Sequence, residues 1–137
     1  GSEMCIRDSR NAEVMIPKQW IVQLPEVSYE MAYAAVCRLL SSDSRPNAFF
    51  TISDVFAAAV IRAAKRVHLH VPRDILVVGF DNIELSSMTS PSITTVNQPK
   101  FQMGYTACEM LLELMEDPHG EMKSLLLDTE LVIREST

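Results

Sequence analysis

The sequence is poor in cysteine, glycine and tryptophan: its 137 residues include three cysteines, four glycines and one tryptophan. Three cysteines cannot build a framework of several disulfides, which excludes the small disulfide-rich secreted folds. Cys37 and Cys108 fall within helical patterns, and we expect both to be reduced, which indicates a cytoplasmic location. No apolar run approaches the roughly 18 residues that a membrane-spanning helix needs, so we expect no membrane partner.

Positive charge is also scarce. Twelve Lys and Arg residues stand against 18 Asp and Glu, for a net charge of −6. Contacts to phosphates need clustered basic side chains, so this balance argues against direct nucleic-acid binding by the chain itself. A hydrophobic content of 47% with 22% charged residues is typical of one modest globular domain.

Hydrophobic patterns predict alternating strands and helices. The run 75–78 lacks polar alternation, which favours a central strand covered on both faces. Alternation of strands and helices at these lengths predicts an α/β fold with a parallel sheet. The expected elements are strands at 20–24, 47–52, 75–79 and 125–133, helices at 29–41, 54–67 and 100–116, and a crossing segment at 93–98.

The helix expected at 54–67 is rich in alanine, with Val55, Ala59, Ala63 and Val67 as its inward stripe. Small side chains allow a close approach on more than one side of a helix. Tight packing on the sheet and a contact between subunits are both compatible with this pattern, and both can hold together.

Asp81 is the first candidate for a binding residue. It follows the apolar strand and Gly79, at the carboxyl end of the strand, where open α/β sheets bind their ligands. A carboxylate there can accept two hydrogen bonds from hydroxyl or amino groups of a small ligand. The alternative is that Asp81 only begins a turn, as aspartate commonly does. The residues alone leave the two interpretations open.

The stretch Val71-Pro-Arg-Asp-Ile-Leu-Val-Val-Gly-Phe-Asp-Asn82 is followed by Pro91-Ser-Ile-Thr-Thr-Val-Asn-Gln-Pro99. In order and spacing it resembles the effector-binding core of the lactose-repressor/purine-repressor family of bacterial transcription regulators. The similarity extends to the last residues, Glu130-Leu-Val-Ile-Arg-Glu-Ser-Thr137.

This resemblance covers residues 20–137 and implies a Rossmann-like lobe of a periplasmic-binding-protein-like (type I) two-lobed core, truncated at its N-terminus. The helix at about 100–116 would belong to the other lobe, and the final strand would return across the hinge. The implied function is effector sensing and homodimer formation, with operator DNA bound only through a helix-turn-helix outside this chain. The implied effector is sugar-like or nucleobase-like. The resemblance implies neither an enzyme nor a cofactor.

Residues 1–9 join abruptly to the rest and carry no periodicity. They read as the translation of a transposase-type sequencing-library adapter, and a Gly-Ser cloning scar is the rival explanation for the first two only. We therefore exclude them from functional reasoning and assign residues 10–137 to the effector-binding domain. This interpretation predicts that the natural protein is longer at its N-terminus. It also leaves open that this chain is the product of a truncated reading frame and has no function of its own.

The resemblance also implies roles for individual residues. The family uses the aspartate at Asp81 to hold the effector. Ser53 stands where the family has an asparagine that points at the ligand, and the shorter serine would need a bridging water. The following Asp54 is expected to cap its helix.

Two further positions are weaker candidates. Val27 occupies the place of an aromatic residue that stacks on a sugar or base, and Tyr29 substitutes only if the local register slips. Otherwise Tyr29 is a surface residue at a helix start. Gln98, in the crossing segment, is a minor candidate contact whose main implied role is to connect the two lobes.

The chain shows little sign of metal binding or catalysis. His68 and His70 have the spacing of a metal pair, but no third ligand is near in sequence. In the resembled family the position of His68 is usually glycine, which fits a left-handed residue after a helix, where histidine costs about 1 kcal/mol. No nucleophile elbow orders a Ser-His-Asp set.

The main rival is a solute-binding protein of a transport system, which uses the same two-lobed core. The patterns at 94–99 and 134–137 favour the regulator.

Overall fold

The structure is a computed structural model, and it describes residues 9–118, 120 and 123–137. A mixed sheet of four strands has the order β1-β2-β3-β4. Strands β1, β2 and β3 are parallel, and β4 runs antiparallel to β3. The predicted α/β class with a mostly parallel sheet is therefore confirmed.

The bounds of the strands are Ala48–Phe50 for β1, Leu76–Phe80 for β2, Thr94–Asn97 for β3 and Glu130–Val132 for β4. Nearly all of the leader 1–9 lies outside the described residues.

Three long helices match the predicted ones closely. Their bounds are Tyr29–Leu40 for α2, Asp54–Arg66 for α3 and Lys100–Glu116 for α5. Ser28 caps α2 as expected, since its hydroxyl accepts from the Met31 amide at 3.4 Å. The looser stretch predicted at 82–92 contains a one-turn helix, α4 (Leu85–Met88).

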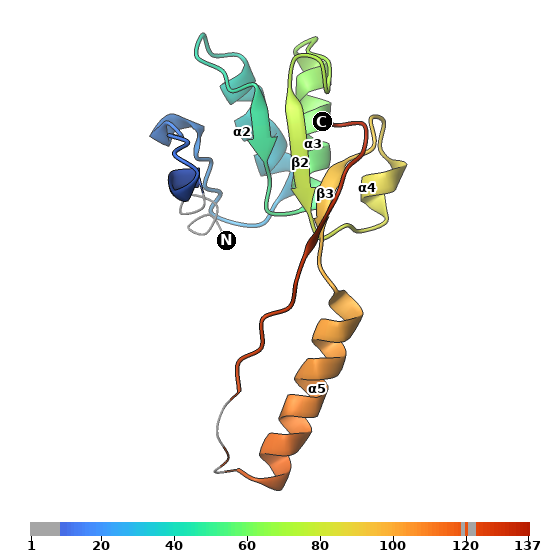
Figure 1. Ribbon diagram of the computed structural model, residues 1–137. Helices are drawn as coiled ribbons and strands as arrows, with labels where there is room; N and C mark the ends of the chain where they lie inside the picture. The colour runs from blue at the N-terminus through green and yellow to red at the C-terminus, as the bar shows by residue number, and fades with distance from the viewer. Residues whose placement is uncertain (1–8, 119, 121–122) are drawn as a thin grey trace.

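Helices α2 and α3 cover one face of the sheet and form the core with it (Figure 1). The buried face of α3 consists of Asp54, Ala57, Ala59, Val60, Ala63 and Ala64. Ala59 and Ala63 point inward as predicted. Val55 is 37% exposed, so its place in the inward stripe was wrong: the helix turns Ala57 and Val60 toward the sheet instead.

The opposite face of the sheet is only partly covered by the described residues, which corrects the expectation that both faces of strand 75–78 are covered. Ile75 and Val77 are fully buried beneath the helices, whereas Leu76 is 42% exposed. On β1, Phe50 is 49% exposed and makes an edge-on contact with Phe80. The second face of β2 is therefore half covered: Leu76 is exposed, whereas Val78 is half-buried and lines a hollow together with residues of the N-terminal segment.

The predicted strand at 20–24 does not form. Trp20 ends a 3-10 turn, η1 (Lys18–Trp20), and residues 21–24 lie extended without a strand partner among the described residues. A strand needs a neighbour for its backbone hydrogen bonds. Here a hollow of about 700 Å³, lined by the apolar side chains of 20–22 and of β1, separates the two segments. The strand predicted at 125–133 is shorter than expected and comprises only β4.

The last residues of the chain bridge the start of β2 and the start of β3, near the C-terminus in Figure 1. The buried Ser136 hydroxyl donates to the Val77 carbonyl at 2.6 Å and accepts from the Thr94 amide at 2.8 Å. The Val77 amide in turn donates to the Ser136 carbonyl at 2.9 Å. The C-terminal segment thus belongs to the sheet although it comes last in sequence.

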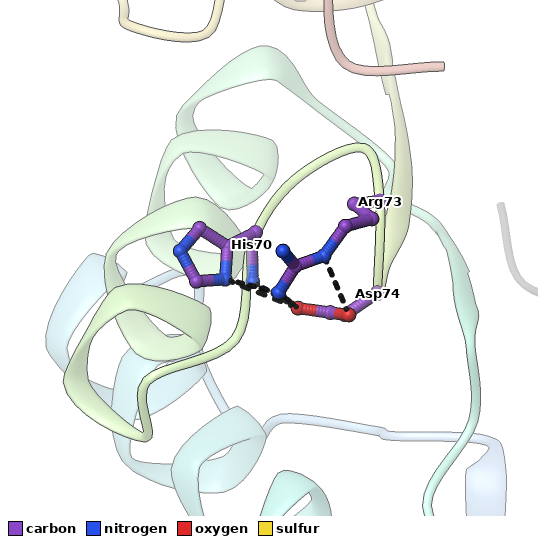
Figure 2. Close-up of polar contacts among 3 residues, drawn as sticks. All are labelled: His70, Arg73 and Asp74. Atoms are coloured by element: carbon purple, nitrogen blue, oxygen red, sulfur yellow. Dashed lines mark hydrogen bonds and ion pairs between the residues drawn. The ribbon is translucent and has the colours of Figure 1, made fainter.

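The loop that leads from α3 into β2 is held by Asp74 (Figure 2). Arg73 donates to both carboxylate oxygens, at 3.2 and 3.1 Å, and the His70 amide donates at 2.8 Å. The Arg73 guanidinium, followed by the His70 amide, holds the pKa of Asp74 well below its usual value. Because the pKa is depressed in the folded chain, this contribution to stability is present at neutral pH and is lost on acidification.

Helix α3 ends in a Schellman motif around His68. His68 has φ 60°, its amide donates to the Lys65 carbonyl at 3.2 Å, and the Leu69 amide donates to Ala64 at 2.9 Å. The left-handed conformation predicted for His68 is therefore confirmed.

We predict that His68→Gly raises the free energy of unfolding by about 1 kcal/mol, because glycine adopts positive φ without the steric cost of a Cβ atom. Urea unfolding measures the change. The control Lys65→Gly lies inside the same helix, where φ is negative, and should lower stability by about 1 kcal/mol. Equal effects of the two glycines would contradict the prediction.

Helix α5 stands away from the sheet, and the segment that follows it returns alongside (Figure 1). None of its residues is buried, although it carries six exposed large apolar side chains. These are Phe101, Met103, Tyr105, Leu111, Leu112 and Met115. An exposed apolar surface of this kind is typical of an interaction site.

We predict that the 137-residue chain self-associates or unfolds with low cooperativity, because this surface is in contact with water. Sedimentation velocity over a range of concentrations measures the association. The double variant Leu112→Gln/Met115→Gln keeps strong helix formers and should reduce it. A sharp, concentration-independent thermal transition of the unchanged chain, with dispersed NMR amide signals, would refute this prediction.

Candidate ligand-binding site

Asp81 lies directly after β2, at the edge where the parallel strands end. Its φ is 98°, and its amide donates to the Val96 carbonyl at 3.0 Å. Gln98 reaches it from the end of β3: its Nε2 donates to Oδ1 of Asp81 at 2.6 Å. Strand order thus brings together two predicted site residues that are 17 positions apart. Lys100, in the first turn of α5, donates from Nζ to the carbonyl oxygen of Asp81.

Asn82, which the sequence analysis did not single out, holds the turn after Asp81. It also has a positive φ, 49°. Its Oδ1 accepts from Nη2 of Arg134 at 2.8 Å, and its Nδ2 donates to Oδ1 of Asn97 at 3.1 Å. Its amide donates to the Thr95 hydroxyl at 3.3 Å. Two consecutive left-handed residues are thus held by side chains from β3 and from the C-terminal segment.

Asp54 is fully buried beneath this turn. One carboxylate oxygen accepts from the Thr95 hydroxyl at 2.5 Å and the other from the Ile83 amide at 2.8 Å. Its expected role as helix cap was wrong: it is the first residue of α3, and Ser53 is the cap. Asp54 instead ties α3 to β3 and to the turn after β2.

Ser53 follows β1 at the same edge of the sheet. Its hydroxyl accepts from the Phe56 amide at 3.4 Å, so it serves α3 as N-cap. A capping serine accepts through one lone pair and keeps its own proton for another partner. Its role toward a ligand therefore remains a prediction.

Val27 and Tyr29 lie at the start of α2. The Val27 side chain is 87% exposed. The guanidinium of Arg62 lies 5.8 Å from the ring centre of Tyr29 and 4.6 Å from that of Tyr33, so Tyr29 takes part in an α2–α3 contact. In the described part of the chain, no hydrogen bond or ring contact joins Val27 or Tyr29 to Asp81. Their ligand role is therefore a prediction with no support from these contacts.

Among the described residues, no three His, Cys, Asp or Glu side chains lie close enough together to hold a metal ion. No helix among these residues combines the length and the apolar character needed to cross a bilayer.

Comparison with known proteins identifies the fold. The family model described as "Periplasmic binding protein-like domain" matches residues 8–137. The chain belongs to this family. Among curated proteins, it is 38% identical over 128 residues to the HTH-type transcriptional repressor CytR of Escherichia coli (strain K12), which covers 93% of the chain and 37% of that protein. It is 40% identical over 134 residues to the repressor PurR of Aliivibrio fischeri, covering 95% of the chain and 39% of that protein.

Solved structures of transcription regulators are also similar to this chain. A putative transcriptional regulator LacI from Bacillus cereus subsp. cytotoxis has a TM-score of 0.88 at 27% identity, over 96% of this chain and 47% of that one. The transcriptional regulator CelR–cellobiose complex has a TM-score of 0.86 at 28% identity, over 96% and 40%. The resemblance to the lactose-repressor/purine-repressor family is confirmed. The chain spans less than two fifths of the length of the two curated repressors.

The periplasmic-binding-protein-like fold of this chain depends on Gly79 for the close approach of Asp54. A Cβ atom at this position would lie 2.2 Å from Oδ1 of Asp54 and 3.1 Å from Cγ2 of Ile93. Neither neighbour can retreat easily, because both are fully buried.

We predict that Gly79→Ala lowers the free energy of unfolding by about 2 kcal/mol, through overpacking beside a buried carboxylate. Urea unfolding measures the loss. Gly104→Ala is the matched control, since nothing lies within 4 Å of its added Cβ. In the interior of α5 that change should stabilise by up to about 1 kcal/mol. Unchanged stability of Gly79→Ala would show that the Asp54 contact is looser than described.

Proposed function

We propose that this chain is the effector-binding part of a bacterial transcription regulator. Its effector is a small polar molecule, sugar-like or nucleobase-like, and the protein works in the cytoplasm as a homodimer. Operator DNA is bound by a helix-turn-helix outside this chain, and the chain itself catalyses no reaction. The observation that carries the proposal is the placement of Asp81, with Gln98 beside it, at the carboxyl edge of the parallel sheet.

The chemistry of Asp81 supports a ligand rich in hydroxyl or amino groups. Gln98 already donates to Oδ1, and among the described residues no hydrogen bond reaches Oδ2. A carboxylate oxygen free in this way accepts charge-assisted hydrogen bonds from a sugar hydroxyl or a base amino group. The similar CelR–cellobiose complex supports the sugar class.

Coupling to DNA binding would run through the crossing segment. Gln98 contacts Asp81 and stands two residues before Lys100, which begins α5 and donates to the backbone of the same turn. A ligand that competes for Asp81 changes the contacts that hold the start of α5. In this way ligand affinity and the orientation of α5 become linked, which is what an allosteric regulator requires.

A solute-binding protein of a transport system is the alternative with the same core. Sequencing the source DNA upstream of the codon for Arg10 separates the two. An in-frame helix-turn-helix supports the regulator, whereas an in-frame signal peptide would overturn it. The repressor relatives CytR and PurR favour the first outcome.

We predict that Asp81→Asn weakens ligand binding at least tenfold, because hydrogen bonds to a charged acceptor are worth about 1.5–3 kcal/mol. Isothermal titration calorimetry with D-ribose, cellobiose, sucrose, adenine and adenosine is the measurement. Asp43→Asn, in the exposed loop after α2, is the matched control and should leave affinity unchanged. Failure of all five compounds to bind the unchanged chain would overturn the sugar-or-nucleobase assignment.

A further inference from the structure

Arg134 contacts three neighbouring segments that lie 41, 48 and 52 positions before it in the sequence. Its Nη2 donates to Oδ1 of Asn82 at 2.8 Å. Its Nη1 donates to the hydroxyl of Ser86 at 3.0 Å and to the carbonyl oxygen of Ile93 at 2.8 Å. One planar guanidinium thus links the turn after β2, the helix α4 and the start of β3. A lysine ammonium is a single point on a flexible stem and cannot reproduce this fork.

The turn that Arg134 holds is conformationally demanding. Asp81 and Asn82 both have positive φ, 98° and 49°. Residues other than glycine persist in such conformations only where their surroundings hold them. Asp81 has backbone contacts to Val96 and Lys100, whereas Asn82 carries the side-chain contacts that hold the turn to β3 and to Arg134.

We propose that Arg134 is a positioning residue for Asp81, acting through Asn82. This rests on the proposed function, in which Asp81 receives the effector. Arg134 fixes Asn82, Asn82 fixes the left-handed turn, and the turn aims the Asp81 carboxylate toward Gln98 and the ligand. Arg134 does not itself contact the ligand.

The position of Arg134 also connects the site to α5. It follows β4, which continues the segment that returns alongside α5 (Figure 1). Lys123 of that segment forms a 2.6 Å ion pair with Glu113 of α5. A shift of α5 therefore acts on Asp81 from two directions, through Gln98 before the helix and through Arg134 after it. This arrangement links the direction of the carboxylate to the position of the helix.

The test is made first without ligand, by NMR of the 137-residue chain carrying the background substitutions Leu112→Gln/Met115→Gln, which reduce self-association. The probes are the side-chain amide signals of Gln98 and the carboxyl carbon signal of Asp81. In Arg134→Met we expect the Gln98 amide protons to exchange with water at least tenfold faster. The chemical shifts of both probes should move toward those of solvent-exposed side chains. Arg134→Lys should not restore them. Arg38→Met, on the exposed side of α2, is the matched control and should leave both signals in place.

Two results would overturn the proposal. One is an unchanged pair of signals in a folded Arg134→Met chain. If that variant does not fold, Asn82→Gly serves instead, because it relieves the positive φ while removing the acceptor of Arg134. Unchanged Gln98 and Asp81 signals in Asn82→Gly are the second overturning result, and their loss in a folded chain supports the proposal.

Calorimetry then separates this inference from the proposed function, using any of the five compounds above that binds. Altered signals together with an affinity at least tenfold lower in Arg134→Met support both. Altered signals in a chain that binds none of the compounds support Arg134 as a positioner of the Asp81 side chain and overturn the effector class. An unchanged affinity despite altered signals overturns positioning for the ligand.

Discussion

The carboxylate of Asp54 is the contact on which the carboxyl edge of the sheet depends. It is fully buried, and its two oxygens accept hydrogen bonds from the hydroxyl of Thr95 and the amide of Ile83. A buried carboxylate that loses its donors is costly, so β3 and the turn after β2 must stay where they supply them. Its place at the first residue of α3 also sets the negative charge against the positive end of the helix dipole. The absence of a side chain at Gly79 makes room for this arrangement.

Around this anchor, polar contacts replace apolar packing as the force that positions the candidate site. One network of side-chain hydrogen bonds joins Asn82, Ser86, Asn97 and Arg134. No buried side-chain nitrogen or oxygen in the described chain lacks a hydrogen-bond partner. Such a fully satisfied network rigidifies the turn that carries Asp81. The same edge carries the connection to α5, so the candidate binding residue Asp81 and the start of α5 share one set of hydrogen bonds.

Sequence patterns predicted the helices well because their signals are local. Ser28 marks the start of α2, Pro99 precedes α5, and apolar spacing sets the length of each helix. Strands were less predictable. Residues 20–24 have a strand-like composition but no strand partner among the described residues, and the partial exposure of the second face of β2 could not be inferred from its apolar run. A strand exists only through its neighbour, and a local pattern does not say whether a neighbour is present.

The sequence by itself determined the family, the α/β class, the extents of the three long helices and the placement of Asp81 at a strand end. It also indicated the left-handed residue at His68. Only the tertiary structure decided that Gln98 donates to Asp81, that Ser53 rather than Asp54 caps α3, and that Arg134 holds Asn82. The physical reason is separation along the chain. Arg134 and Asn82 are 52 positions apart, and strand order and register, which no local pattern contains, bring them together.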